Sequence, residues 1–306
     1  MNRPAHIISL CIAALPLLLA QSCQSDDHAV TTGSHTVEIE AAISGNATRI
    51  AYNGKTSQFD EGDKIRVTAV PAGTNIDENS LSSTYEYTPL HQPTPPTPTY
   101  TWQSPAPILW PLEETAYDFY GIYPAIDNNY DYQIKGDAAH DDVMLAKTAS
   151  KSYKDGKISL AFSHKMAKLA VNLHLRDEIP ADADIEVSVE AIARFTIDLA
   201  SQKVTTAGED KKEITFIEQT PKSEYYALLP EQEGTTTIKI TPTYPNLQNL
   251  QNYTWTIPQG SLPLKAGEIT TVNLNVGNDG ITIGSVTVTP WTEEEIDNQG
   301  QQAETE

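Results

Sequence analysis

The sequence predicts an all-β protein made of two tandem β-sandwich domains. About a dozen short segments alternate apolar and polar residues, which is the period-two pattern of half-buried strands. Turn-forming Gly, Asp and Asn residues separate these segments, and no segment keeps a helical period beyond about two turns. Strands without intervening helices are typical of sandwiches, and a chain of 306 residues fits two sandwiches better than one.

The first element is an apolar run from Ile7 to Ala20, which follows Asn2-Arg3. At about fourteen residues it is too short for a transmembrane helix and is typical of a signal peptide. One of the two cysteines, Cys11, lies inside this run, and the other is Cys23. Leu-Ala-Gln-Ser-Cys, ending at Cys23, resembles the lipobox of bacterial lipoproteins, so we expect a signal peptide over 1–22. Ordinary cleavage nearby, with Cys23 unmodified, is the alternative.

A polar stretch without periodicity follows Cys23, and we expect residues 23–36 to form a flexible tether. Its first part contains Ser25, Asp26 and Asp27. This acidic stretch resembles the export signal that sends lipoproteins of the Bacteroides group to the outer face of the outer membrane. The expected location is therefore the cell surface.

The N-terminal domain is predicted over residues 37–165. Its first strand places Val37, Ile39 and Ala41 on one face and glutamates on the other. Further strands are predicted at 64–70, 116–123 and 157–162. The proline-dense stretch 91–98 is expected to be an exposed loop, because proline cannot donate to a strand ladder.

The C-terminal domain is predicted over residues 166–291. Strands are predicted at 169–175, 185–189, 195–199, 214–217, 237–240, 253–257, 269–276 and 281–288. The last of these carries four apolar residues, Ile281, Ile283, Val286 and Val288. Residues 292–306 are acidic with almost no apolar side chain, and are expected to be a disordered tail.

The charge of the chain limits its partners. It carries 41 acidic and 20 basic residues, a formal net charge of −21. Such a surface repels phosphate backbones, so nucleic acid is not an expected partner. It also does not favour electrostatic docking onto an anionic membrane.

No motif for catalysis or metal binding is present. The seven histidines are scattered, and there is no zinc-protease, serine-hydrolase or phosphate-loop motif. Asp127–Asp131 begins like a calcium loop, but Tyr132 replaces its glycine and Ala138 its glutamate. Asp137–Asp142 is interpreted as a solvated loop. We therefore expect no catalytic residue, no cofactor and no metal site.

Several aromatic residues could be taken for ligand-binding residues, but packing in the core explains them more simply. Trp110, Tyr120 and Tyr123 are expected to pack in the core or between domains, not to form a sugar platform. His164 is expected to be a hydrogen-bonded core histidine at the domain junction.

Six segments, in order along the chain, resemble motifs of the fimbrillin family (Mfa-like and FimA-like pilus subunits of the Bacteroides group). They are Phe59–Val67, Pro107–Pro124, Asp142–Ala146, Phe162–Val171, Leu264–Val272 and Ile281–Trp291. The resemblance implies two transthyretin-like Greek-key sandwiches, secretion as a lipoprotein and polymerisation into fimbriae.

The resemblance also implies assembly by strand exchange with other fimbrial subunits. A protease removes the first strand, here Thr36 to Ile43, and a donor strand from a neighbour fills the groove. Arg49 is the first basic residue after Cys23 and is the candidate cleavage site. The alternative is that Arg49 is an ordinary exposed arginine.

The acidic residues after Trp291 do not resemble a donor strand. Either Ile281 to Val288 is released as the donor, or the subunit donates nothing and lies at a fibre end. We favour an accessory or tip-like adhesive subunit, with a surface glycan or protein as a further partner. The alternative function is a lipid-anchored, glycan-binding surface protein.

Overall fold

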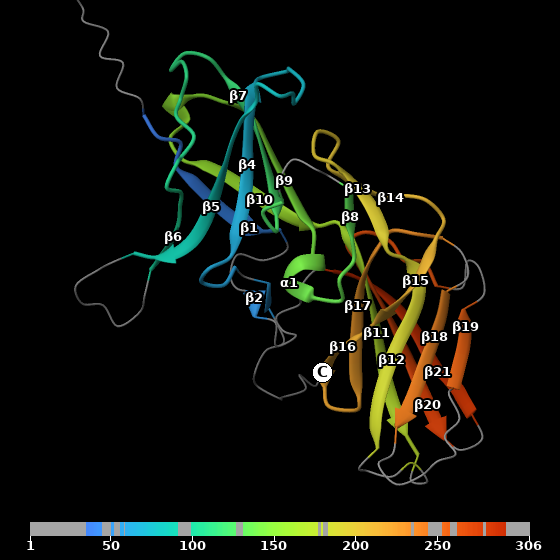
Figure 1. Ribbon diagram of the computed structural model, residues 1–306. Helices are drawn as coiled ribbons and strands as arrows, with labels where there is room; N and C mark the ends of the chain where they lie inside the picture. Colours follow the sequence, from blue (N-terminus) through green and yellow to red (C-terminus); the bar gives the residue numbers. More distant parts are fainter. Residues whose placement is uncertain are drawn as a thin grey trace, which may run out of the picture. The chain divides into compact units, whose positions relative to one another are not determined.

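Figure 1 shows a computed structural model of the chain, in which strands dominate every part that is described. The described residues are 35–44, 50–51, 56–57, 59–90, 99–126, 131–176, 179, 183–233, 236–243, 253–257, 262–277 and 280–291. The prediction of an all-β protein is confirmed. Among these residues, no helix is long and apolar enough to cross a membrane.

The first half of the chain forms a seven-stranded sheet in the order β1-β10-β9-β7-β4-β5-β6. Its strands are β1 (Ile39–Ile43), β4 (Lys64–Pro71), β5 (Leu81–Pro89), β6 (Tyr100–Gln103), β7 (Tyr117–Tyr123), β9 (Met144–Lys151) and β10 (Ile158–His164). Neighbouring strands are antiparallel except β1, which runs parallel to β10 at the sheet edge.

The central strand β7 is buried on both faces. Tyr117 and Phe119 belong to the hydrophobic cluster of this sheet, whereas Tyr120 and Ile122 belong to the second cluster, which continues into the C-terminal half. Gly121 is required here, because a Cβ at this position would lie 2.5 Å from Cζ of Phe162. The seven-stranded sheet is therefore packed on both sides along its middle.

The C-terminal half forms two further sheets. The five-stranded sheet has the order β16-β17-β11-β20-β21, and the four-stranded sheet has the order β15-β12-β18-β19. Their bounds are β11 (Met166–Leu175), β12 (Asp184–Ile192), β15 (Lys211–Thr215), β16 (Ile217–Thr220), β17 (Glu224–Pro230), β18 (Thr236–Thr243), β19 (Tyr253–Ile257), β20 (Glu268–Gly277) and β21 (Gly280–Pro290).

These two sheets form a sandwich, because the inward side chains of both belong to one hydrophobic cluster. Val171 and Leu274 come from the five-stranded sheet, and Val189 and Ile238 from the four-stranded sheet. Alternate residues of each strand supply this core, as the period-two pattern predicts.

Smaller elements complete the described fold. They are a three-stranded sheet of β8 (Asp131–Gln133), β13 (Arg194–Asp198) and β14 (Lys203–Thr206), the pair β2 (Ile50–Ala51) and β3 (Thr56–Ser57), the helix α1 (Ala138–Asp141) and the 3-10 turn η1 (Tyr153–Asp155). Only Lys165 separates β10 from β11. The domain boundary predicted between residues 165 and 166 would lie between these two strands, and it stays a prediction.

Candidate assembly site

The segment from His35 to Ser44, which contains β1, is held along one side by β10. Ile39 to Ile43 pair in parallel register with Ile158 to Phe162. The Ile158 N–H donates to the Glu38 carbonyl at 2.8 Å, and the Ser44 N–H donates to the Phe162 carbonyl at 2.5 Å. We call residues 35–44 the N-terminal segment.

The opposite side of the N-terminal segment is hydrogen-bonded to the stretch that follows β6. The Val37 N–H donates to the Ile108 carbonyl at 2.8 Å, and the Trp110 N–H donates to the His35 carbonyl at 2.9 Å. Thr36 and Leu109 form the antiparallel bridge between these two bonds. The start of the segment, His35 to Val37, thus lies between two parts of the chain, whereas β1 itself pairs only with β10 among the described strands.

The side chains of the segment enter the core of the seven-stranded sheet. Val37, Ile39 and Ile43 are only 2%, 5% and 6% exposed, and Ala41 is half-buried against the same cluster. Full burial of one such Val or Ile side chain contributes about 1.5–3 kcal/mol. The predicted inward face of Val37, Ile39 and Ala41 is confirmed.

Tyr85 fixes the groove that receives the segment. Its buried hydroxyl donates to the Val37 carbonyl at 3.4 Å and accepts the Ile108 N–H at 3.1 Å. Burial raises the pKa of Tyr85, so the hydroxyl stays a donor at neutral pH. Loss of the segment would leave the Tyr85 hydroxyl without its Val37 acceptor, and several backbone groups of β10 and of residues 108–110 without partners.

The last strand, β21, forms the other notable edge. It pairs with β20 only, and no strand among the described residues pairs with its outer edge. Its apolar side chains remain in solvent: Ile283 is 48% exposed, Val286 38% and Val288 41%.

The register explains why this exposure is unusual. Ile283, Val286 and Val288 lie opposite Leu274, Val272 and Thr270, three buried residues of β20. Directly opposed residues project to the same face of a sheet, so the apolar stripe of β21 lies on the core-facing side. It is an uncovered continuation of the inner face of the sandwich.

A bulge at Gly284 produces this alignment. The pairing shifts between Asn273 and Leu274, so that Gly284 is the extra residue on β21. Without the bulge, Ile283 and Val286 would project to opposite faces, because side chains alternate along a regular strand. A Cβ on Gly284 would lie 3.3 Å from the Asn273 carbonyl oxygen, which makes glycine the suitable residue.

The end of β21 is anchored by Trp291. Its ring stacks on the imidazole of His164, with centroids 3.9 Å apart and planes 5° apart. The backbone N–H of Trp291 donates to the Gly267 carbonyl at 2.7 Å. His164 is itself buried, with Nδ1 2.8 Å from Oδ1 of Asp142. The prediction that His164 is a hydrogen-bonded core histidine is confirmed.

Comparison with known proteins identifies the family. The family model of fimbrillin-like proteins matches residues 48–291, most of the chain. The chain belongs to the fimbrillin-like family. A search of curated proteins finds no match.

Two solved structures share the fold of this fimbrillin-like protein. A candidate cell adhesion protein from Bacteroides uniformis superposes with a TM-score of 0.63 at 21% identity, over 86% of this chain and 99% of its own. A second from Bacteroides ovatus superposes with a TM-score of 0.61 at 15% identity, again over 86% and 99%. Both likenesses show a shared fold.

The fimbrillin-like motifs contact one another in the first sheet. Oδ1 of Asp63 accepts a hydrogen bond from the Tyr123 hydroxyl at 3.1 Å. Phe59 packs edge-on against Tyr123 and Phe162, with both centroid distances 5.6 Å. Trp110, Tyr120 and Tyr123 are all buried, which confirms their predicted packing role.

One interpretation of the sequence was wrong. Within Asp137–Asp142, predicted to be a solvated loop, Asp141 and Asp142 are buried. Asp141 accepts N–H groups from residues 135, 136 and 137, which closes the turn before α1. Burial raises the pKa of Asp141 against the opposing effect of these hydrogen bonds. Among the described residues, no group of three candidate ligands could hold a metal ion.

Several predicted site residues lie outside the described residues. These are Cys23, Ser25, Asp26, Asp27 and Arg49, together with the tail 292–306 and most of the calcium-like stretch at 127–130. Sequence reasoning missed Tyr85, for which the sequence offers no distinctive signal. It also missed the bulge at Gly284, although a single glycine within a predicted strand is a known signal of a bulge.

Proposed function

We propose that the protein is a subunit of surface fimbriae that joins its neighbours by exchange of β-strands. The observation that carries the proposal is the N-terminal segment, whose Val37, Ile39 and Ile43 side chains are buried. The segment is hydrogen-bonded to β10 along β1, and to Ile108 and Trp110 at its start. In sequence, residues 45–49 alone separate it from β2, and these include Arg49. One cut at Arg49 would divide the segment covalently from the rest of the protein.

Departure of the cut segment leaves a groove that a new strand would fill. The groove carries apolar pockets vacated by Val37, Ile39 and Ile43, and unpaired backbone groups of β10 on one side and of Ile108 and Trp110 on the other. An incoming strand satisfies both, because main-chain hydrogen bonds supply affinity and alternate side chains supply specificity.

The candidate donor is β21 of a neighbouring copy or of a related subunit. Its pairs Ile281/Ile283 and Val286/Val288 each have the two-residue spacing of Val37/Ile39 in the segment that they would replace. Since the stripe of β21 is already exposed, its release sacrifices little apolar burial. The contacts that oppose release are the backbone pairing with β20, the packing of partly buried Ile281 against the core, and the Trp291 stack.

The position of the subunit in the fibre follows from whether β21 is donated. If it is retained, the subunit accepts a strand without giving one and belongs at an end, as an accessory or tip-like adhesive subunit. The exposed stripe supports donation, and the acidic sequence after Trp291 supports the end position. Deleting residues 292–306 should leave assembly intact in both cases.

Delivery to the surface rests on the sequence around Cys23. We propose that acylated Cys23 anchors the precursor in the outer membrane, with Ser25, Asp26 and Asp27 directing it outward. Because Cys23 precedes the cut, the anchor would leave together with the N-terminal segment.

Proteolysis tests the proposed site. Trypsin treatment of the folded protein should give a new N-terminus at Ile50, and Arg49→Gln should prevent this cut. Lys55→Gln, which removes the next basic residue, serves as the matched control and should be cut normally. An intact Arg49 peptide bond in fully treated, folded protein would contradict the proposal.

A further inference from the structure

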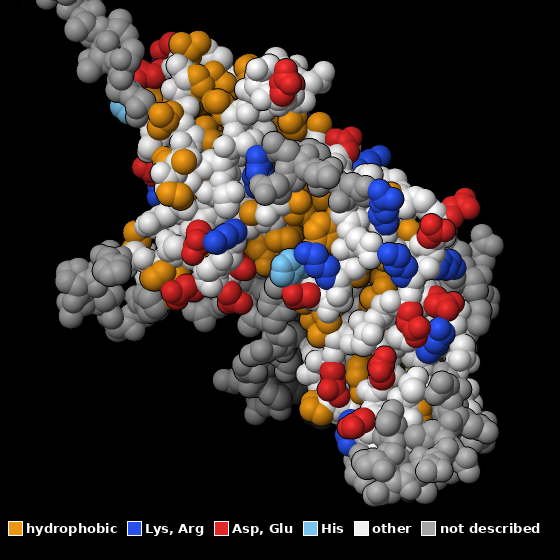
Figure 2. Space-filling view, in the orientation of Figure 1, with side chains coloured by type: hydrophobic (Ala, Val, Ile, Leu, Met, Phe, Trp, Pro, Cys, Tyr) orange, Lys and Arg blue, Asp and Glu red, His pale blue; other side chains and the backbone are white. Residues whose placement is uncertain are grey.

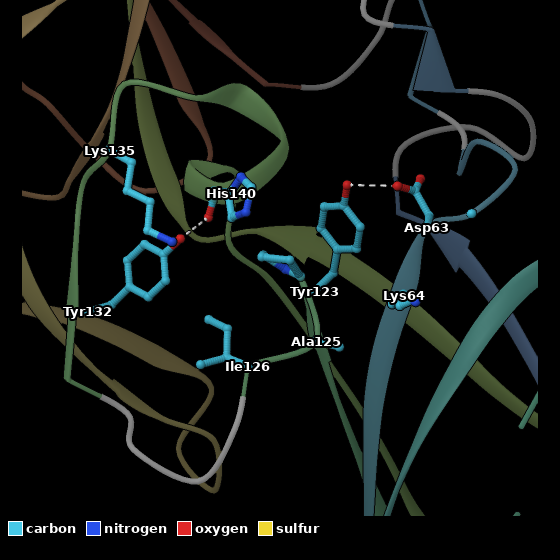
Figure 3. A pocket seen from close by; sticks show the side chains of 10 residues that line it. Asp63, Lys64, Tyr123, Ala125, Ile126, Tyr132, Lys135 and His140 are labelled. Carbon is cyan, nitrogen blue, oxygen red and sulfur yellow. Dashed lines mark hydrogen bonds between the residues drawn. The ribbon is translucent and has the colours of Figure 1, made fainter. Parts of the chain in front are cut away.

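A pocket of about 420 Å³ lies beside the start of β4 and the end of β7 (Figure 3). Its walls are formed by residues 62–64, 123–126, Tyr132, Lys135 and His140. This volume lies within the range of small-molecule sites, about 300–1,000 Å³. Figure 2 shows hydrophobic side chains gathered in the middle of the same face, with His and Lys or Arg side chains beside them. The pocket is separate from β1 and β21.

One wall presents an aromatic ring in a fixed position. The Tyr132 hydroxyl donates to the His140 carbonyl at 2.8 Å, as drawn in Figure 3, and its ring packs against Phe195 at 5.1 Å. Burial, assisted by Asp141 and Asp137, raises the pKa of Tyr132 to about 12, so this anchoring bond persists at neutral pH. Nζ of Lys135 lies 5.5 Å from the centre of the ring.

The facing wall presents a carboxylate. Oδ1 of Asp63 accepts the Tyr123 hydroxyl at 3.1 Å, and Oδ2 accepts the Asp60 N–H at 2.7 Å. These bonds hold the carboxylate in place, and each oxygen keeps capacity for another donor. Figure 3 shows Asp63 and Tyr123 across the pocket from Tyr132 and Lys135.

His140 adds a further polar group at the rim. Its Nδ1 lies 2.7 Å from Oδ2 of Asp137, an arrangement in which Nδ1 carries the proton. Nε2 is then an acceptor in the neutral ring. The pocket therefore offers a donor at Lys135, acceptors at Asp63 and His140, and apolar surface from Tyr132, Pro124 and Ile126.

We propose that this pocket binds a neutral sugar residue of a surface glycan. A pyranose ring has a face of C–H groups that packs on an aromatic ring, and hydroxyls that both donate and accept hydrogen bonds. Lys64 also lines the pocket, but its ammonium group is paired with Glu86 at 3.3 Å. The remaining charges, Lys135 and Asp63, are of opposite sign, so the pocket has no net charge that would select an ionic ligand. A neutral, hydroxyl-rich ligand satisfies both groups.

The proposal does not depend on strand exchange. A subunit that fails to polymerise would still bind the sugar, and loss of sugar binding would leave assembly unchanged. Together, the two properties would make the fibre adhesive.

The test is saturation-transfer NMR of the purified full chain with the methyl glycosides of glucose, galactose, mannose and N-acetylglucosamine, followed by a glycan array. We expect binding of at least one neutral sugar. Lys135→Ala removes one charged donor from an exposed side chain, and should weaken binding about tenfold or more.

Lys147→Ala is the matched control. Lys147 also lies over a tyrosine, 4.9 Å from the centre of the Tyr120 ring, but it does not line the pocket. Its removal should leave the affinity unchanged. Absence of binding to every neutral glycan, binding to peptides instead, or equal losses in both variants would overturn the proposal.

Discussion

Replacing Ile39 by alanine should loosen the N-terminal segment without loosening the rest of the fold. Ile39 is 5% exposed and lies in the middle of the segment, between the Val37 and Ala41 positions. Truncation of a buried isoleucine to alanine costs about 2–5 kcal/mol, the lost burial plus the cavity left behind. The groove has fixed walls at Tyr85 and Trp102, so we expect little collapse into that cavity.

This free energy should appear as local opening of the segment. Every 1.4 kcal/mol is a factor of ten in an equilibrium constant, so opening should become about thirty to several thousand times more frequent. Native-state hydrogen exchange measures it at two amides, Ile158, which donates to Glu38, and Trp110, which donates to His35. The amide of Phe216, which donates to Val187 in the C-terminal sandwich, is the internal reference.

Glu40→Ala is the matched control on the same strand. Its side chain is exposed and, among the described residues, accepts a hydrogen bond from the Ser159 hydroxyl alone, at 3.3 Å. The change in stability should therefore stay within about 0.5 kcal/mol. The reasoning is refuted if Ile39→Ala accelerates Phe216 as much as Ile158 and Trp110, because the segment would then open only with global unfolding.

Three further predictions follow from other contacts. Trp291→Ala removes the ring stacked on His164, a contact that contributes about 0.5–1.5 kcal/mol. Hydrogen exchange of the β21 amides should therefore accelerate about two- to tenfold. Unchanged exchange would show that Trp291 does not hold the strand. Gly121→Ala places a methyl group against the Phe162 ring and should lower the free energy of unfolding in urea by about 1–3 kcal/mol, with partial recovery in a Phe162→Leu background. Burial raises the pKa of Tyr226 to about 12, above its value of about 10 in the unfolded chain. The contribution of this tyrosine to the free energy of unfolding is therefore complete below pH 10 and is lost as the pH rises through about 12. Tyr226→Phe should make the loss of stability at alkaline pH less steep, and a pH profile identical to that of the wild type would contradict the assignment.

The alternation of residues predicted the strands and their faces well. Val37, Ile39 and Ala41 were predicted on one inward face, and this is where they lie. Periodicity defines the face of a strand but not its partner or direction. The pattern therefore could not predict that β1 pairs in parallel with β10, more than a hundred residues away. Nor could it predict the bridge between Thr36 and Leu109.

The site at β21 shows a second limit. The strand itself was predicted, but regular alternation over Ile281 to Val288 would place Ile283 and Val286 on opposite faces. The bulge at Gly284 brings them together, and the neighbouring sheet leaves them exposed. The burial of Asp141 and Asp142 was not predicted for a related reason. The sequence alone does not show that backbone N–H groups of a turn bind Asp141, or that His164 binds Asp142.

Electron microscopy of the trypsin-treated protein tests the central claim, exchange of the N-terminal segment, most directly. When the wild-type protein is cut at Arg49, alone or mixed with other fimbrial subunits, we predict fibres in the micrographs. The same sample should give a ladder of SDS-resistant oligomers on a gel. The Arg49→Gln protein should remain monomeric under the same treatment. Fully cleaved wild-type protein that stays monomeric in every mixture, with its N-terminal segment still bound, would contradict the account.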